Sequence, residues 1–180
     1  GTPMALNLLR GGYDLTVWNR TVAACEPLRE AGAVVVRTPA AVAGDCEITF
    51  AMLADPAAAL AVACGPDGVC EGLAAGRSYI DMSTVDEFTS RRIATAVEAR
   101  GARFLEAPVS GTRAPAEQGN LIILAAGDQS LYDEAAGALA LMGKKCVFAG
   151  DIGQGARLKL VVNMIMGGMK QRGFHFMAFY

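Results

Sequence analysis

The sequence contains few of the residues that build metal sites or disulfide frameworks. It has a single histidine, His175, and five cysteines scattered without the short spacings typical of metal ligands. An odd number of scattered cysteines indicates buried thiols in a reducing compartment. We therefore expect no metal site, and an intracellular protein of the cytoplasm, a plastid or a mitochondrion.

The sequence also lacks an excess of positive charge and long apolar runs. Its net charge of −2 gives no electrostatic basis for binding nucleic acid or an anionic membrane surface. No apolar run reaches the roughly 18 residues that a membrane-spanning helix needs. The N-terminus shows no targeting peptide, and because the first residue is glycine rather than methionine, we expect the chain to begin inside a longer protein.

Short β-branched segments alternate with helical segments along most of the chain. Its 180 residues, 53% of them hydrophobic, are enough for one domain with its own core. The alternation predicts an α/β fold: a Rossmann-like, doubly wound and mostly parallel sheet with helices on both faces. A capping box at 84–87 is expected to begin one helix, and 108–119 is expected to be a loop. The expected strands are 13–18, 34–36, 47–53, 78–83, 103–107, 121–126 and 146–148.

Polar or glycine-rich residues follow four of the expected strands. They occupy positions 19–21, 53–55, 83–84 and 108–112. In open α/β sheets, ligands bind beyond the carboxyl ends of the strands. Each of these segments alone is compatible with an ordinary turn, but four of them at the same edge of a sheet favour a shared cleft.

The turn at 19–21 bears on the choice between NADP and NAD. A dinucleotide-binding fold reads the ribose about 20 residues after its glycine fingerprint, usually with Asp or Glu. Here the position has Asn19 and Arg20, and a guanidinium binds a 2′-phosphate that a carboxylate would repel. The residues therefore favour NADP, the alternative being an ordinary turn. The chain has no complete GxGxxG, and Gly1 fits only its last glycine, which places the first strand upstream.

A segment near the C-terminus carries two polar side chains in apolar surroundings. Lys159 and Asn163 are four residues apart, so they share one face of a helix. Two glycines, Gly153 and Gly155, precede this helix. Lys159 is compatible either with a surface lysine whose stem packs on apolar neighbours or with a catalytic cation that faces a cleft.

Several motifs of the chain match a known family. The two most specific are Ala-Pro-Val-Ser-Gly at 107–111 and Gly-x-Gly-x-x-x-Lys-x-x-x-Asn at 153–163. Through them the chain resembles the β-hydroxyacid dehydrogenases, which are related to 3-hydroxyisobutyrate dehydrogenase, and most closely the plant-type glyoxylate/succinic semialdehyde reductases. The resemblance extends from Gly1 to about Met169. Further matching stretches are 16–21, 50–56, 79–86 and 115–117.

The resemblance implies a role for each matching residue. It makes Lys159 the catalytic lysine that donates a proton, and Asn163 its polar neighbour in the substrate site. Ser110, Gly111 and Thr112 match the loop that holds the substrate carboxylate, with Thr112 standing where family members often have Gly or Ser. The residues implied to contact the cofactor, NADP, are Gly1, Asn19, Arg20, Thr21, Met52, Leu53 and Thr84.

The implied reaction is the NADPH-dependent reduction of a small aldehyde acid, either glyoxylate to glycolate or succinic semialdehyde to 4-hydroxybutyrate. A positioned ammonium can donate a proton to the alkoxide that develops as a hydride reaches the carbonyl carbon. Three alternatives stay open. They are another β-hydroxyacid dehydrogenase such as 3-hydroxyisobutyrate dehydrogenase, a catalytically inactive NADP-binding fragment, and a family member that serves as a non-catalytic interaction module.

The resemblance also divides the chain into two parts. Residues 1–150 are expected to form an NADP-binding Rossmann-type domain without its first strand. Residues 151–180 are expected to form the interdomain helix and the start of a truncated helical domain. The family implies a homo-oligomer at full length, whereas the 180-residue chain by itself is expected to be inactive. After about Met169 the sequence departs from the family pattern, and His175 in that tail is given no role.

Overall fold

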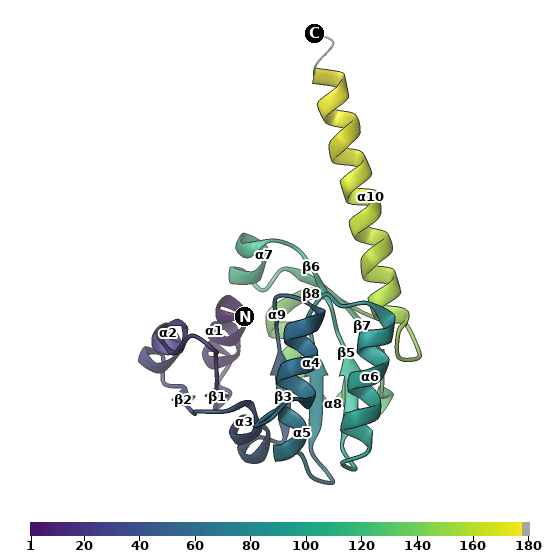
Figure 1. Ribbon diagram of the computed structural model, residues 1–180. Helices are drawn as coiled ribbons and strands as arrows, with labels where there is room; N and C mark the ends of the chain where they lie inside the picture. The colour runs from purple at the N-terminus through teal and green to yellow at the C-terminus, as the bar shows by residue number, and fades with distance from the viewer. Residues whose placement is uncertain (178–180) are drawn as a thin grey trace.

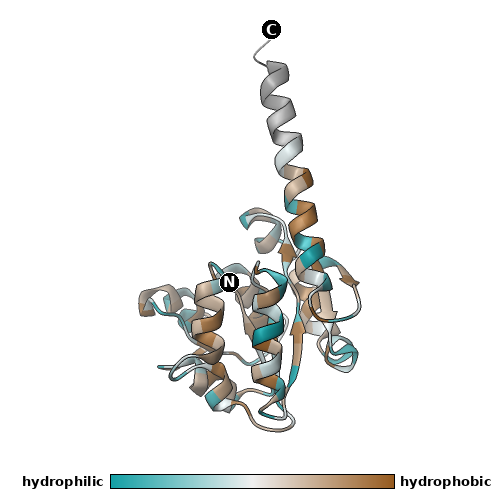
Figure 2. Cartoon of the chain, turned by 45° about the vertical axis from the view of Figure 1, so that its right-hand side comes forward, coloured by the Kyte–Doolittle hydropathy of each residue, from teal (hydrophilic) through white to brown (hydrophobic). Residues whose placement is uncertain are grey.

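The computed structural model describes residues 1–177, with side chains described as far as Gly168. Strands and helices form a body from which the last helix, α10 (Gln154–Met177), projects (Figure 1). The side chain of His175 lies outside the described part of the chain. Apolar residues lie on the projecting part of α10 next to the body (Figure 2). Those exposed there are Leu160, Val161, Met164, Ile165 and Met166.

The main sheet has six strands and is mostly parallel. Its path runs β3-β4-β5-β7-β6, and β8 pairs with the other edge of β7. Strands β3, β4 and β5 are parallel, as are β7 and β8, whereas β7 is antiparallel to β5 and to β6. The strands are β3 (Ile48–Ala51), β4 (Ser78–Asp81), β5 (Arg103–Glu106), β6 (Val109–Ser110), β7 (Leu121–Gly127) and β8 (Gly143–Phe148).

A second, two-stranded sheet lies apart from the main one. Its strands, β1 (Thr16–Val17) and β2 (Val34–Val35), pair in parallel. Within residues 1–177, no strand pairs with the free edge of β3. Helix α1 (Thr2–Arg10) instead secures the N-terminal segment, because its Met4 and Leu8 are buried in the core beneath the main sheet.

Helices cover both faces of the main sheet, as the alternating pattern predicts. One core joins α1, α8 and α9 to the face that carries Ile80 and Leu105. The other joins α4, α5 and α6 to the face that carries Tyr79 and Phe104, whose rings lie 6.0 Å apart. The helices are α2 (Glu26–Glu30), α3 (Pro39–Asp45), α4 (Pro56–Cys64), α5 (Val69–Gly72), α6 (Glu87–Glu98), α7 (Arg113–Glu117), α8 (Gln129–Glu134) and α9 (Ala136–Met142), with a 3-10 turn, η1 (Val22–Cys25), before α2.

Two local predictions differ from the structure. The cap of α6 is Asp86, whose side chain accepts a hydrogen bond from the Thr89 N–H at 3.0 Å, so a capping box headed by Thr84 is wrong. The segment 108–119 is not a plain loop, since it contains β6 and α7. Pairing of β6 with β7 imposes the strand, and such pairing with a later segment leaves no local signal.

The contact between α3 and α5 predicts a large effect of one methyl group. A Cβ added to Gly72 would overlap the carbonyl oxygen of Ala40 on α3. We expect Gly72→Ala to lower the free energy of unfolding by about 3 kcal/mol, because the backbones must separate. Urea unfolding followed by circular dichroism measures the change.

Gly44 provides the matched control on the facing helix, since a Cβ there would lie 4.0 Å from the carbonyl oxygen of Gly72. Gly44→Ala is expected to be neutral or to stabilise the protein by up to about 1 kcal/mol, as in other helix interiors. Equal stability of the two variants would contradict the close packing of α3 against α5.

Candidate functional site

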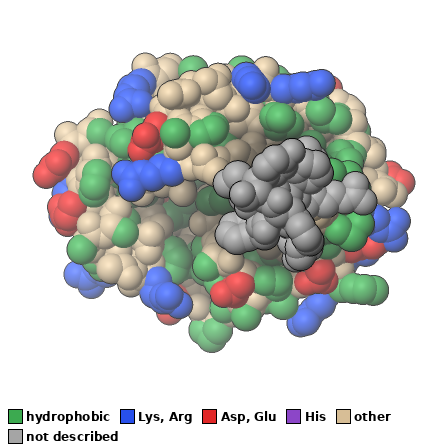
Figure 3. Space-filling model, turned by 90° about the horizontal axis from the view of Figure 1, so that it is seen from above, with side chains coloured by type: hydrophobic (Ala, Val, Ile, Leu, Met, Phe, Trp, Pro, Cys, Tyr) green, Lys and Arg blue, Asp and Glu red, His purple; other side chains and the backbone are tan. Residues whose placement is uncertain are grey.

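The carboxyl ends of the parallel strands lie at the upper edge of the body in Figure 1. The N-terminus, β6, α7 and the start of α10 lie at the same edge (Figure 1). Seen from above, the surface is hollowed beside α10 (Figure 3). The predicted site residues are distributed along this edge, on the turns after β1, β3, β4 and β6 and on α10.

The N-terminus of α1 lies against the turn that follows β3. A Cβ added to Gly1 would be 3.8 Å from the Cβ of Met52, which is itself 40% exposed. The backbone N–H of Leu53 donates a 2.9 Å hydrogen bond to the Ser83 hydroxyl on the turn after β4. The first N–H groups of a helix have no partners within it, and such a helix start favours a phosphate. Gly1, Met52 and Leu53 are therefore placed together, as a dinucleotide site requires.

The turn after β1 presents a free cation. The Asn19 Oδ1 atom accepts a hydrogen bond from the Thr21 N–H at 3.0 Å, which folds the turn around Arg20. All three residues are exposed. Among the described residues, no carboxylate forms an ion pair with Arg20. Its guanidinium is therefore available for an anion such as a 2′-phosphate.

The turn after β4 rests on a buried acid that sequence reasoning missed. Asp81 is 1% exposed, and its Oδ1 atom accepts a hydrogen bond from the Ser83 N–H at 2.9 Å. Burial raises the pKa of this carboxyl above its ordinary value. Because Ser83 in turn accepts from Leu53, the network ties the turns after β3 and β4 together. Thr84, half-buried, follows directly.

The expected substrate loop begins with β6. Ser110 pairs with Ile122 of β7 and is half-buried. Gly111 has a φ of +145°, and a Cβ there would lie 2.7 Å from a methyl group of Leu121, so the position requires glycine. Thr112 is exposed at the start of α7, where its side chain makes no capping hydrogen bond. The loop thus leaves polar groups of Ser110 and Thr112 free for a ligand.

Lys159 is buried in the second turn of α10, at 8% exposure. Burial lowers the pKa of its ammonium below the ordinary value of 10.5. No carboxylate in the described part of the chain pairs with it. This burial favours a lysine that faces a cleft over a surface lysine. Asn163, one turn later, is exposed.

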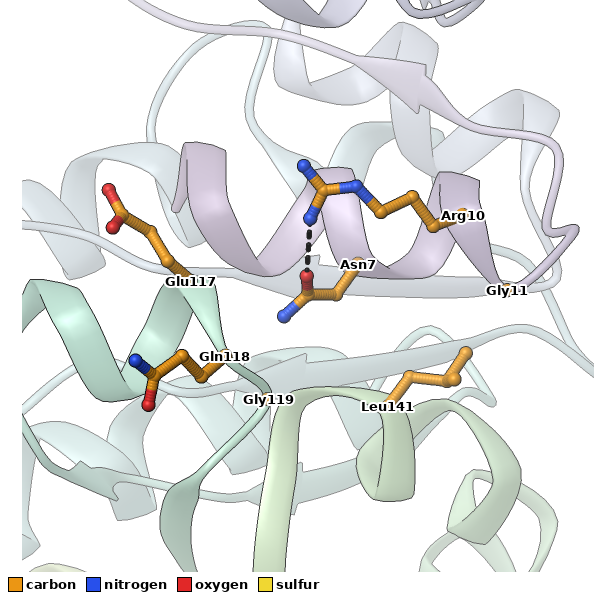
Figure 4. Close-up of a pocket in the computed structure, with 7 residues that line it drawn as sticks. All are labelled: Asn7, Arg10, Gly11, Glu117, Gln118, Gly119 and Leu141. Atoms are coloured by element: carbon orange, nitrogen blue, oxygen red, sulfur yellow. Dashed lines mark hydrogen bonds between the residues drawn. The ribbon is translucent and has the colours of Figure 1, made fainter.

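The pocket drawn in Figure 4 lies between α1, α7 and α9, and none of the predicted site residues lines it. Its volume is about 240 Å³. Asn7 donates a 2.9 Å hydrogen bond to the carbonyl oxygen of Ala116, and the Arg10 guanidinium donates to Asn7 at 3.0 Å (Figure 4). The bond from Asn7 to Ala116 ties α1, which Gly1 caps, to α7, which follows the expected substrate loop.

Within residues 1–168, no group of three His, Cys, Asp or Glu side chains could hold a metal ion. No helix in the described part of the chain is both long and apolar enough to cross a bilayer.

Residues 1–150 match the family model described as the NAD binding domain of 6-phosphogluconate dehydrogenase. The chain is 52% identical over 169 residues to glyoxylate/succinic semialdehyde reductase 2, chloroplastic, of Arabidopsis thaliana. The aligned residues cover 94% of this chain and 47% of the relative. It is 46% identical over 167 residues to the human cytokine-like nuclear factor N-PAC, covering 93% of this chain and 30% of that protein. The chain therefore spans less than half the length of either relative.

The fold has close counterparts among solved structures. The 3-hydroxyisobutyrate dehydrogenase of Mycobacterium tuberculosis, determined with L-serine, superposes with a TM-score of 0.85 at 25% sequence identity. The superposition covers 91% of this chain and 55% of that one. The α/β architecture with helices on both faces of a mostly parallel sheet is thus shared with a dehydrogenase.

Proposed function

The chain belongs to the β-hydroxyacid dehydrogenase family of oxidoreductases, and from this premise we propose that it is part of an NADPH-dependent reductase of small aldehyde acids. The observation that carries the proposal is Lys159, whose side chain is 8% exposed and has no ion pair among the described residues, on the helix that begins at the edge where the carboxyl ends of the strands lie. Burial of a lysine without an ion pair lowers stability, and groups with pKa values perturbed in this way concentrate at functional sites.

Lys159 is proposed to donate the proton in the reduction. NADPH, when bound, supplies the hydride that reaches the carbonyl carbon. The negative charge that develops on the substrate oxygen needs a positioned donor, and an ammonium both stabilises that charge and transfers the proton. Burial lowers the pKa of Lys159 below its ordinary value. The lowered pKa makes the ammonium a stronger acid and therefore a better proton donor.

The cofactor side of the proposal places NADP along α1 and the first turns. The N–H groups at the start of α1 suit the pyrophosphate, and Arg20, which has no ion pair within the described part of the chain, suits the 2′-phosphate. The exposed Met52 and the turn after β4 suit contacts with the remainder of the dinucleotide. The residues proposed to bind NADP are Gly1, Asn19, Arg20, Thr21, Met52, Leu53 and Thr84.

The substrate side of the proposal uses the loop after β6 and the face of α10. Ser110, Gly111 and Thr112 are proposed to hold the carboxylate of glyoxylate or succinic semialdehyde, since the hydroxyl groups of Ser110 and Thr112 can donate hydrogen bonds and the Thr112 side chain makes no capping bond. Asn163 is proposed to contact the substrate from the same helix face as Lys159. Fixing the carboxylate end orients the carbonyl carbon for the reaction.

The deciding experiment measures the loss of NADPH absorbance by the full-length protein with glyoxylate and with succinic semialdehyde. We expect turnover with at least one of them, and weaker turnover with NADH. Oxidation of 3-hydroxyisobutyrate in the reverse direction tests the alternative substrate class. Binding of NADPH without turnover of any of these compounds would reject the reductase and favour a non-catalytic module.

Ser110 offers a test of the substrate loop alone. We expect Ser110→Ala to raise the KM for the aldehyde acid about tenfold, because a hydrogen bond to a carboxylate contributes about 1.5 kcal/mol. The affinity for NADPH should change by less than about twofold. Steady-state kinetics and NADPH fluorescence titration measure the two quantities. Ser130→Ala, at an exposed serine of α8, is the control and should leave KM unchanged. An unchanged KM in Ser110→Ala would contradict the assignment of the loop.

We also propose that residues 1–150 are the NADP-binding part and that α10 is the joint to a helical domain. Five large apolar side chains of α10 are exposed in the described chain, including Met164 at 72%. An exposed apolar stripe of this size marks a surface that another structural element covers. In the proposed arrangement, that element closes the cleft over Lys159 and completes the substrate site.

A further inference from the structure

The carboxylate of Glu106 holds the first turn of α10. Glu106 ends β5 and is only 2% exposed. Its Oε1 atom accepts hydrogen bonds from the backbone N–H groups of Gly153, Gly155 and Ala156, at 2.9, 2.7 and 3.1 Å. Its Oε2 atom accepts a hydrogen bond from the Ser90 hydroxyl on α6. One buried side chain therefore joins β5, α6 and α10.

These hydrogen bonds provide partners both for the free N–H groups at the start of α10 and for the buried carboxylate of Glu106. The first N–H groups of a helix have no partners within it, and the helix dipole adds partial positive charge there. A buried carboxylate without hydrogen bonds would be strongly destabilising. Since Glu106 receives four hydrogen bonds, three of them from the start of α10, the charge and the helix start stabilise each other.

Two glycines, Gly153 just before α10 and Gly155 in its first turn, allow the backbone to approach this carboxylate. A Cβ added to Gly155 would lie 3.0 Å from the Glu106 Oε1 atom and 2.6 Å from the carbonyl oxygen of Leu124. Gly153 has a φ of +100°, which side chains rarely adopt. The Gly-x-Gly spacing therefore has a structural reason: Gly153 is required by its backbone conformation, and Gly155 by the close approach of Leu124 and Glu106.

Lys159 depends on this first turn for its position. It lies four residues after Gly155, about one helical turn along the same axis. Among the described residues, no ion pair fixes its ammonium. A second side-chain contact at the start of α10 is the ion pair of Arg157 with Glu87, at 2.5 Å, which is weak because the Arg157 side chain is 58% exposed to solvent.

We propose that Glu106 is a positioning residue for Lys159: it fixes the start of α10 against β5 and α6 and so aims the ammonium at the reacting carbonyl. Ser90 assists by holding the second carboxylate oxygen. The inference rests on the proposed reductase function. Its magnitude follows from geometry, because a displacement of about 1 Å at a catalytic group lowers the rate about 100-fold.

The test is Glu106→Gln in the full-length protein. Glutamine keeps the size of the side chain, but it removes the charge, and its amide nitrogen cannot accept a hydrogen bond. We expect kcat to fall about 100-fold, with the NADPH dissociation constant within about twofold of wild type. Hydrogen exchange in the peptide that contains Gly155 and Ala156 should become at least about tenfold faster.

Glu87→Gln is the matched control. It removes the carboxylate that pairs with Arg157 on the same helical turn, but it leaves Glu106 and its four hydrogen bonds in place. Its kcat should stay within about twofold of wild type. Ser90→Ala is the milder variant, which decides by the same criteria if Glu106→Gln does not fold. For Ser90→Ala we expect a loss of kcat of about fivefold at unchanged NADPH affinity.

Three outcomes would overturn the inference: kcat within twofold of wild type in Glu106→Gln, an equal loss of kcat in Glu87→Gln, or a loss of NADPH affinity as large as the loss of kcat. If the wild-type protein reduces no aldehyde acid, the proposed function fails instead. The rate of acetylation of Lys159 then decides about Glu106. Faster acetylation in Glu106→Gln supports the positioning role, and an unchanged rate rejects it.

Discussion

Replacing Lys159 by methionine is expected to abolish turnover and to leave NADPH binding nearly intact. Methionine preserves the packing of the side chain, but it removes the ammonium that is proposed to protonate the substrate oxygen. The combined loss of a general acid and of charge stabilisation corresponds to a decrease in kcat of about 1,000-fold or more. Stopped-flow absorbance of NADPH with glyoxylate or succinic semialdehyde measures the rate, and fluorescence titration measures the affinity.

The pH dependence of the wild-type enzyme follows from the same group. Because the protonated lysine is the donor, kcat should fall as pH rises through the pKa of Lys159. Burial places that pKa below 10.5, so the decline should begin at a lower pH than for an exposed lysine. In Lys159→Met, the residual kcat should no longer fall with rising pH in this range.

As pH rises, the contribution of Lys159 to the stability of the fold should increase while kcat decreases. Between the lowered folded pKa and the unfolded value near 10.5, the unfolded chain binds more protons at this group than the folded chain does. The stability contributed by Lys159 therefore rises with pH across that window, and the charged side chain is destabilising below it. Lys159→Met should unfold at a higher temperature than wild type at neutral pH.

Lys145→Met, at an exposed residue of β8, is the control for both measurements. It should change neither kcat nor the midpoint of thermal unfolding appreciably. Retention of more than a tenth of the wild-type kcat in Lys159→Met would contradict the role of this lysine. Loss of NADPH binding in the same variant would point instead to a structural defect.

The second large effect concerns the choice of cofactor. Arg20→Ala is expected to weaken NADPH binding by about 30- to 100-fold and to leave NADH binding unchanged. The reason is that a charge-assisted, bidentate bond between a guanidinium and a phosphate contributes about 2–3 kcal/mol. Arg20 has no competing ion pair among the described residues, so this energy is available to the 2′-phosphate.

Fluorescence titrations with NADPH and NADH, at low and at high salt, measure this preference. The wild-type preference for NADPH should shrink as salt screens the exposed guanidinium. Arg92→Ala, on the exposed outer side of α6, controls for a general change of surface charge and should bind both cofactors like wild type. Equal losses for NADPH and NADH in Arg20→Ala would contradict a specific contact with the 2′-phosphate.

Much of the fold can be predicted from the sequence because the relevant signals are local. Alternation of strand and helix patterns predicts a sheet covered on both faces, and the structure confirms it. Thr38, directly before Pro39, has the sequence signature of a helix cap, and its hydroxyl accepts a hydrogen bond from the Ala41 N–H at 3.1 Å. Thr84 also fits a cap motif, but Asp86, two residues later, competes with it and caps α6 in the structure.

The candidate site was predictable only as a set of positions. Sequence spacing places Lys159 and Asn163 on one helix face, and the family motif gives both a proposed role. The sequence does not show which of the two side chains is buried, whereas in the structure Lys159 is buried and Asn163 is exposed. Asp81 lies in a stretch that matches the family, and Glu106 directly precedes the motif at 107–111, but the sequence does not show that either acid is buried or what it contacts.

The sequence by itself determined the order of the elements, the family and the spacing of the motif on α10. Only the tertiary structure decided which polar groups are buried and what they contact. The physical reason is the distance along the chain over which each property is set. Helical and strand periodicity depends on residues up to four positions apart, whereas Glu106 reaches the start of α10 from 47 to 50 residues away. The burial that lowers the pKa of Lys159 likewise exists only after the chain has folded.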